Sequence, residues 1–224
     1  MASNEFATDP AETKDRNFVT ALARGLDVLR CFRENEIALT NTDFSERTGL
    51  SSMEIGDRAQ EEMRKLRDGP NSYVTIAIGE VHRLDVVYIA TKRSREDVAL
   101  QIRVGSRLPL FDSAIGRAIL TGMSDESRDR AFRYAAAEGP EFETRARDSY
   151  AAAMTEFADK GFCSSYGDWR PDVNGIAVPV FSPNGSQVYG LNVGGPAFHV
   201  KKRQLETTYA QLLSAAAQAI SIRF

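Results

Sequence analysis

Apolar side chains recur along the chain with two kinds of spacing, which predict helices in some segments and strands in others. Between residues 18 and 32 they return at steps of three and four, the spacing of one helix face. A second helix is expected over 52–68, where charged residues occupy the opposite face. Its apolar face consists of Met53, Ile55, Ala59, Met63 and Leu66. Gly69-Pro70 ends this helix.

The rest of the chain, residues 70–224, alternates between strand and helix signals. Runs rich in β-branched and aromatic residues predict two strands over 73–78 and 86–90, joined as a hairpin by a polar turn over 79–85. A third strand is expected over 98–104. Helices are expected over 112–120 and from Ser124 to about residue 137. A further helix ends at Gly161, with one apolar face made of Tyr150, Met154, Phe157 and Ala158.

Two more strands and a helix complete the pattern. Strands are expected over 175–181 and 187–193, and Asn184-Gly185 between them is a strong signal for a tight hairpin turn. A last helix over 201–222 should bury six apolar residues. They are Leu205, Tyr209, Leu212, Leu213, Ala216 and Ile220.

These elements predict an α+β fold with a small helical N-terminal part. Residues 1–17 are polar and without period, so they are expected to be a disordered tail. Residues 18–51 would form part of a helix-turn-helix, and 52–69 a linker or first helix of the next domain. Residues 70–224 would form an antiparallel sheet with flanking helices, the arrangement in which a small ligand often lies beneath the helices.

The segment around Gly49 has the local pattern of a helix-turn-helix. Thr40 or Thr42 can cap a short helix, Gly49 suits the left-handed position that ends one, and Ser51 can cap the next. Two packed helices in any helical domain would show the same pattern, so this signal alone leaves both interpretations open.

Composition narrows the class of protein. The chain has 224 residues, 42% of them hydrophobic and 26% charged, with a net charge of -3. We expect a cytoplasmic protein without a membrane span, because apolar runs are short and the N-terminus is polar. Two distant cysteines and two histidines predict neither a disulfide framework nor a zinc site. A mildly acidic chain argues, at first sight, against binding to nucleic acid.

Several motifs in order resemble those of IclR-type bacterial transcription regulators. Residues 105–118, GSRLPLFDSAIGRA, resemble the family's G-x-x-x-P-L-x-x-(S/T)-A-x-G-(R/K)-A motif. Residues 160–162 with 175–181 resemble its (R/K)-G-(Y/F) and G-x-A-x-P-(V/I)-F segments, and 190–196 its strand end G-x-(L/I)-(S/N)-(V/I)-x-G-P. Upstream, residues 21–29 and 46–51 are similar to the opening helix and the helix-turn.

The resemblance covers nearly the whole chain from residue 18 and implies a function. It implies a winged helix-turn-helix joined to a GAF-like domain that binds an effector. Such proteins are homodimers or homotetramers whose affinity for operator DNA is altered by a small metabolite. Thr48 and Ser51 fall on the DNA-binding part. No cofactor and no metal is implied.

One departure from the family is large. After Ser51 the family continues with a recognition helix, a two-stranded wing and the start of a linker, about forty residues judged by mean element lengths. Here Ser52-Met53-Glu54 follows at once. Either this segment is disordered and omitted from the numbering, which we favour because DNA-reading parts are often mobile without DNA, or it is deleted.

The resemblance also places an effector site. Effector acids of the family lie against the helix start at Ala114 and Ile115, where backbone N–H groups carry partial positive charge. Close helix packing would explain the same motif equally well. The ten expected effector-binding residues are Leu100, Leu108, Ser113, Ala114, Ile115, Ser165, Val173, Gly175, Asn192 and Gly194.

Three features refine the expected ligand. Ser165 stands where relatives often have an acid, so the site should favour an anion or a different hydrogen-bond pattern. Asn192 offers both a donor and an acceptor. Phe162, Tyr166 and Trp169 fall near the same loop, which makes an aromatic acid one candidate, although core packing explains any one of them as well.

The resemblance therefore implies a regulator whose operator affinity responds to a small organic acid. The alternative is a stand-alone sensor domain that acts through protein partners without DNA. An enzyme is not expected, because no acid, base or metal set is seen and Cys163 is expected to be buried. Residues 1–51 hold six basic and nine acidic residues, so the whole net charge of -3 lies on the incomplete segment. The net negative charge is thus better explained by a missing basic segment than by a protein that does not bind DNA.

Overall fold

The structure is a computed structural model of the chain, and it describes residues 51–96, 100, 102–182, 185 and 187–221. The chain divides into two compact units, Met1–Glu54 and Ile55–Phe224. The predicted tail over 1–17 and nearly all of the predicted helix-turn-helix over 18–51 lie outside the described residues.

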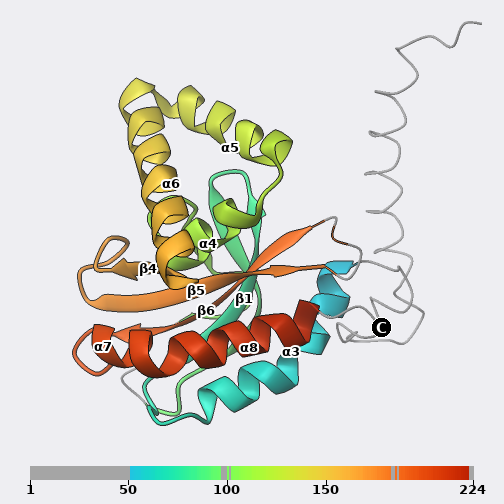
Figure 1. The fold of residues 1–224 in the computed structure, drawn as a ribbon, viewed down its shortest axis with the longest axis vertical. Helices are drawn as coiled ribbons and strands as arrows, with labels where there is room; N and C mark the ends of the chain where they lie inside the picture. Colours follow the sequence, from blue (N-terminus) through green and yellow to red (C-terminus); the bar gives the residue numbers. More distant parts are fainter. Residues whose placement is uncertain (1–50, 97–99, 101, 183–184, 186, 222–224) are drawn as a thin grey trace, which may run out of the picture. The chain divides into compact units, whose positions relative to one another are not determined.

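The second unit is an α+β fold built on one antiparallel sheet of six strands, in the order β3-β2-β1-β6-β5-β4 (Figure 1). The strands are β1 Thr75–His82, β2 Asp85–Lys92, β3 Arg107–Pro109, β4 Cys163–Tyr166, β5 Val173–Phe181 and β6 Val188–Pro196. The helices are α3 Ser51–Arg67, α4 Ala114–Gly122, α5 Asp125–Glu138, α6 Pro140–Lys160, α7 Lys202–Gln204, the π-helical turn Leu205–Tyr209 and α8 Ala210–Ser221. The predicted fold class, an antiparallel sheet with flanking helices, is confirmed.

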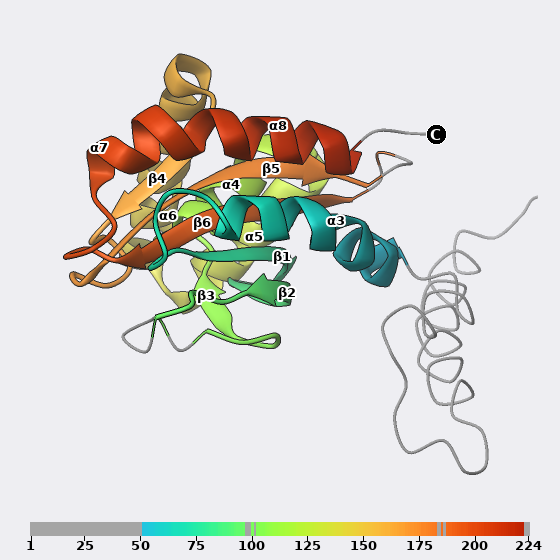
Figure 2. The ribbon, with the colours of Figure 1, turned by 90° about the horizontal axis from the view of Figure 1, so that it is seen from below.

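Helices cover both faces of the sheet, which divides the core into two clusters. Helices α3 and α8 lie side by side on one face, and α4 and α6 lie on the other (Figure 2). Side chains alternate between the two clusters along a strand, so that Ile176 belongs to the α3–α8 cluster and Ala177 to the α4–α6 cluster. The central strands are therefore buried on both faces.

Helix α4 begins at a capped position and packs very close to its neighbours. The Ser113 hydroxyl accepts a hydrogen bond from the Gly116 N–H at 3.2 Å, as an N-cap should. A Cβ on Gly116 would stand 2.0 Å from the Leu110 carbonyl oxygen, and one on Gly190 of β6 would stand 2.4 Å from the Ile115 side chain. Gly116 thus allows the turn before α4 to close on the helix, and Gly190 allows α4 to lie against β6.

The first hairpin differs from its sequence prediction. The strands extend through His82 and restart at Asp85, so the turn is only Arg83-Leu84, with Arg83 in the left-handed region at φ 58°. Gly79 does not end the strand, because the register shifts between Ile78 and Gly79 and the ladder continues past this bulge.

The third strand predicted over 98–104 is wrong for its described residues. Leu100 and Ile102 are buried without strand pairing, while Val104 is 61% exposed. Pairing with β2 begins later, where the Gly105 N–H donates to the Tyr88 carbonyl, and strand β3 starts at Arg107. Leu100 and Ile102 thus belong to a segment that is not a strand. We call it the wall segment, because both residues line the cavity described below.

Two helix faces also differ from prediction. Met154 of α6 is 40% exposed and Ala158 is exposed, because the row Phe142, Ala146, Tyr150, Ala153 and Phe157 is the one that packs on the core. Leu212 is 44% exposed, since the π-helical turn before it underwinds the helix and brings Leu213 to the buried face. Of the predicted Asn184-Gly185 turn, only Gly185 is described, with φ 69°.

The close packing of α4 gives a stability prediction. Gly116→Ala should lower the free energy of unfolding by roughly 2–4 kcal/mol in urea denaturation, because the added methyl meets backbone that cannot move aside. Gly175→Ala is the matched control, since a Cβ there meets nothing closer than 3.4 Å. Equal stability of the two variants would show that α4 does not need this contact.

Candidate functional site

A cavity lies between the first turn of α4 and the sheet. It encloses about 420 Å³ of empty space, part of it open to solvent. Its walls come from β1, β2, β5 and β6, from the wall segment around Leu100, and from the chain that follows β4. Only about 30 Å³ of this space is free for a molecule the size of water, so a larger ligand enters only if the walls move apart.

All ten residues expected from the sequence to bind an effector line this one cavity. Six further residues complete the lining: Thr75, Ala77, Tyr88, Ile102, Trp169 and Asn174. The structure thus brings the predicted set together in space, while its role in binding stays a prediction.

Small side chains in neighbouring strands make room for the cavity. Gly194 of β6 pairs with Thr75 on one side and Gly175 on the other, and Gly175 pairs with Ser165 of β4. In the next row on the same face, Asn192 pairs with Ala77 and Ala177. Because neighbouring rows of small residues face α4, the helix and sheet leave space between them.

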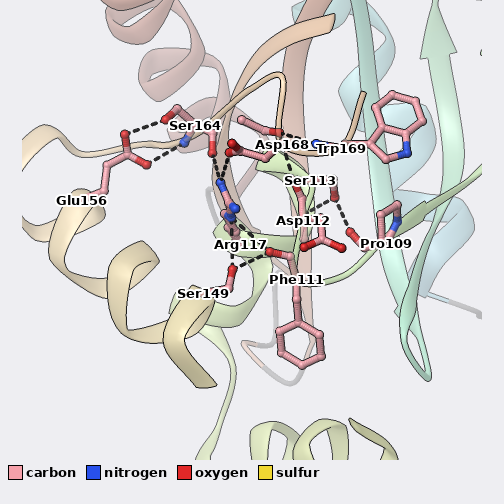
Figure 3. Close-up of polar contacts among 12 residues, drawn as sticks. Pro109, Phe111, Asp112, Ser113, Arg117, Ser149, Glu156, Ser164, Asp168 and Trp169 are labelled. Atoms are coloured by element: carbon pink, nitrogen blue, oxygen red, sulfur yellow. Dashed lines mark hydrogen bonds and ion pairs between the residues drawn. The ribbon is translucent and has the colours of Figure 1, made fainter. Parts of the chain in front are cut away.

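The start of α4 presents two backbone donors to this space. The Ser113 hydroxyl donates to the Pro109 carbonyl at 2.6 Å and accepts from Gly116, so its hydrogen bonds are used within the chain (Figure 3). The N–H groups of Ala114 and Ile115 make no hydrogen bond with any residue that the structure describes. Helix starts with free N–H groups attract anions.

Arg117, one turn into α4, joins the helix to three neighbouring segments (Figure 3). Its Nε donates to the Phe111 carbonyl at 3.1 Å and to the Ser149 hydroxyl of α6 at 3.2 Å. Its Nη1 donates to the Ser164 carbonyl at 2.8 Å and to the Asp168 carboxylate at 2.6 Å. The guanidinium therefore fixes α4 relative to α6, β4 and the loop that carries Trp169.

The edge strand β4, which the sequence analysis did not predict as an element, is held by side chains. Glu156 of α6 accepts from the Ser164 N–H at 2.8 Å and from its hydroxyl at 2.7 Å, which occupies groups that an unprotected edge would expose. Ser165 donates to the Asp112 carbonyl at 2.9 Å. Its hydroxyl thus closes the wall between β4 and α4.

Asn192 and Tyr88 form a hydrogen-bonded pair of side chains in the cavity lining. Asn192 Nδ2 donates to the Tyr88 hydroxyl at 3.0 Å. Asn192 Oδ1 is buried and has no hydrogen-bond partner, alone in this respect among side-chain atoms of the described residues. Burial raises the pKa of Tyr88 well above its usual value, so this phenol stays neutral.

The predicted aromatic cluster is only partly present. Trp169 lines the cavity, but Phe162 and Tyr166 pack in the α3–α8 cluster on the opposite face of the sheet. Alternation along β4 is the reason, since neighbouring residues face opposite sides. The same alternation along β2, where Val86 and Tyr88 are both buried on the α4–α6 side, is a signal that could have placed Tyr88 in the cavity.

Other parts of the described chain offer less chemistry. A wide hollow of about 680 Å³ between the β1–β2 turn and α5, near His82 and Tyr134, contains none of the predicted residues. No three His, Cys, Asp or Glu side chains among the described residues are placed to hold a metal ion. Cys163 is buried as predicted, and burial raises the pKa of its thiol to about 12, so it is not a nucleophile at neutral pH.

No helix in the described ranges has the length and apolar composition to cross a membrane. Of the two residues expected at the DNA, Thr48 lies outside the described residues, and Ser51 is the first residue of α3.

Two family models match the chain. The model described as "Bacterial transcriptional regulator IclR C-terminal" matches residues 47–222, and the IclR helix-turn-helix domain matches residues 21–52. The chain is 25% identical to the Pca regulon regulatory protein of Pseudomonas putida, over 93% of this chain and 85% of that protein.

Solved structures agree with this fold. The crystal structure of an IclR family transcriptional regulator from Brucella abortus has a TM-score of 0.68 and 29% identity, over 96% of both chains. An IclR homolog from Microbacterium hydrocarbonoxydans complexed with 4-hydroxybenzoate has a TM-score of 0.60 and 18% identity, over 89% of this chain and 97% of that one.

The comparison with the Pseudomonas protein bears on the short N-terminal part. That alignment runs over 249 positions but takes only 93% of this chain's 224 residues, about 208, so about forty positions have no counterpart here. The sequence runs without a break through Leu50 and Ser51, so no residues are omitted from its numbering there. The expectation of a disordered segment omitted from the numbering is therefore wrong.

The two family models together span residues 21–222, and the proteins matched are named as regulators of transcription. The chain belongs to the IclR family of DNA-binding bacterial transcriptional regulators.

Proposed function

We propose that this regulator binds a small organic acid, with an aromatic acid as the first candidate, in the cavity at the start of α4, and that binding alters its affinity for operator DNA. The observation that carries the proposal is the pair of N–H groups of Ala114 and Ile115, two residues of the cavity lining, which make no hydrogen bond with any described residue. Two adjacent donors at a helix start are suited to the two oxygens of a carboxylate.

The charge of the cavity supports an anion. No Asp or Glu is among the lining residues, and neutral Tyr88 is the one lining residue with an ionisable side chain. The partial positive charge at the start of α4 is therefore not compensated by a lining side chain. Ser165, which stands where relatives often have an acid, is already bonded to Asp112 and adds no negative charge.

The apolar part of the lining supports a ring-shaped ligand. Trp169, Leu100, Ile102 and Leu108 form apolar walls above a floor of small residues. A flat ring can fill such a narrow space and gain from burial of its apolar surface. The related IclR homolog that was solved with 4-hydroxybenzoate agrees with an aromatic acid as the ligand.

The remaining partners follow the family. We expect a homodimer or homotetramer in which the ligand shifts the population between arrangements that bind the operator and arrangements that do not. We expect no enzymatic activity, since relatives are named as regulators and the described cysteine is inert.

A second candidate function is favoured by one observation. The chain lacks about forty positions of a relative, about the size of the expected recognition helix and wing. Without that segment, the chain would sense its ligand and act through protein partners. DNA binding discriminates between the two candidates.

The acid site predicts a thermal shift with a simple probe. Benzoate at a hundredfold excess over Kd should stabilise the protein by about 2.7 kcal/mol, a rise in Tm of roughly 5–10 °C. Gly175→Val should keep the stability without ligand, since its Cβ meets nothing closer than 3.4 Å, but should abolish the shift by filling the cavity. Benzamide is the neutral control, and a shift with benzamide but not with benzoate would refute the carboxylate site.

The regulator function predicts binding to DNA upstream of its own coding sequence. In fluorescence anisotropy the full chain should prefer that DNA over a scrambled duplex, and the affinity should fall as salt rises. Benzoate should change this affinity in the wild type but not in Gly175→Val. Absence of any sequence preference would reject the regulator and favour the stand-alone sensor.

A further inference from the structure

The cavity contains a second polar group, far from the two donors at the helix start. Asn192 Oδ1 is buried with no protein partner, although a buried amide oxygen normally accepts a hydrogen bond. Leaving such a group unpaired lowers the stability of the fold. A ligand that forms a hydrogen bond with it removes this penalty, so an unpaired group in a cavity indicates a ligand.

The neighbours of Asn192 explain why the protein does not satisfy this group itself. Its partners across the strands are Ala77 and Ala177, which carry no polar side-chain atoms. The Tyr88 hydroxyl is the one group in reach, and it already accepts from Asn192 Nδ2 at 3.0 Å. Rotating the amide would let Tyr88 donate to Oδ1 and would leave Nδ2 unpaired instead. Either orientation leaves one amide atom to be satisfied.

The position of this pair relative to α4 sets the shape of a ligand. Helix α4 touches β6 at Gly190, where an added Cβ would meet Ile115. Asn192 is two residues further along the strand, about 6–7 Å at the usual rise. The distance is between the backbones of Gly190 and Asn192, and a benzene ring with two substituents has a comparable length.

We infer that Asn192 and Tyr88 form a specificity-determining pair that selects an aromatic acid carrying a hydroxyl group over the same acid without one. The inference rests on the proposed function, since it assumes that the carboxylate lies at Ala114 and Ile115. A hydroxyl both donates and accepts, so it satisfies the pair in either amide orientation. A ligand without the hydroxyl leaves the buried amide unpaired, and sites of this kind reject such analogues strongly.

The test compares benzoate with 3-hydroxybenzoate and 4-hydroxybenzoate by isothermal titration calorimetry at neutral pH. The wild type should bind at least one hydroxybenzoate about 10- to 100-fold more tightly than benzoate. The double variant Tyr88→Phe/Asn192→Leu, which makes the pair apolar, should reduce this ratio to about one or invert it.

Thr75→Val is the matched control. Thr75 also lines the cavity, but its hydroxyl accepts from the Ser94 N–H at 3.2 Å and has a partner within the chain. This variant should keep the preference of the wild type for the hydroxybenzoate. A second measurement needs no ligand, since the double variant Tyr88→Phe/Asn192→Leu removes the unpaired amide together with its partner and should leave the Tm unchanged or higher.

The outcomes separate this inference from the proposed function. Equal binding of benzoate and both hydroxybenzoates by the wild type would overturn the selective pair and leave the acid site intact. Retention of the preference in the double variant would overturn it as well. Failure of all three acids to bind would instead refute the acid site at α4.

Discussion

The close contact between α4 and strands β5 and β6 is the constraint on which the site depends. The contact with β6 is possible because Gly190 carries no side chain where it meets Ile115, while Gly116 lets the turn that leads into α4 close on the helix. With α4 in this position, the small residues of β5 and β6 beneath its first turn leave a cavity. The same geometry directs the uncapped N–H groups of Ala114 and Ile115 to that space.

The polar groups around the cavity have separate roles. Four side chains form hydrogen bonds with other parts of the chain and so position α4, β4 and the Trp169 loop. They are Arg117, Glu156, Ser113 and Ser165. The groups left over are two backbone donors at one end and the Asn192 amide at the other. A buried surface that satisfies its structural groups and leaves a few others unpaired is typical of a binding site.

The fold class and the residues of the cavity could be predicted from the sequence. The strand register and the faces on which some side chains lie could not. Motif resemblance located the start of α4 and the ends of β5 and β6, and strand alternation explains why Val173, Gly175, Asn192 and Gly194 share one face. The register of β1 against β6, which brings Thr75 and Ala77 to the cavity, depends on long-range pairing and has no local signal. Phe162 and Tyr166 were misplaced for a related reason, because a short edge strand sets which face they occupy.

The central claim is that an organic acid binds at the first turn of α4, and backbone NMR of labelled protein tests it most directly. On addition of benzoate, the account predicts that the amide resonances of Ala114 and Ile115 shift most, because these N–H groups gain a charged acceptor. Changes centred instead on the wide hollow near His82 and Tyr134, with Ala114 and Ile115 unaffected, would contradict it.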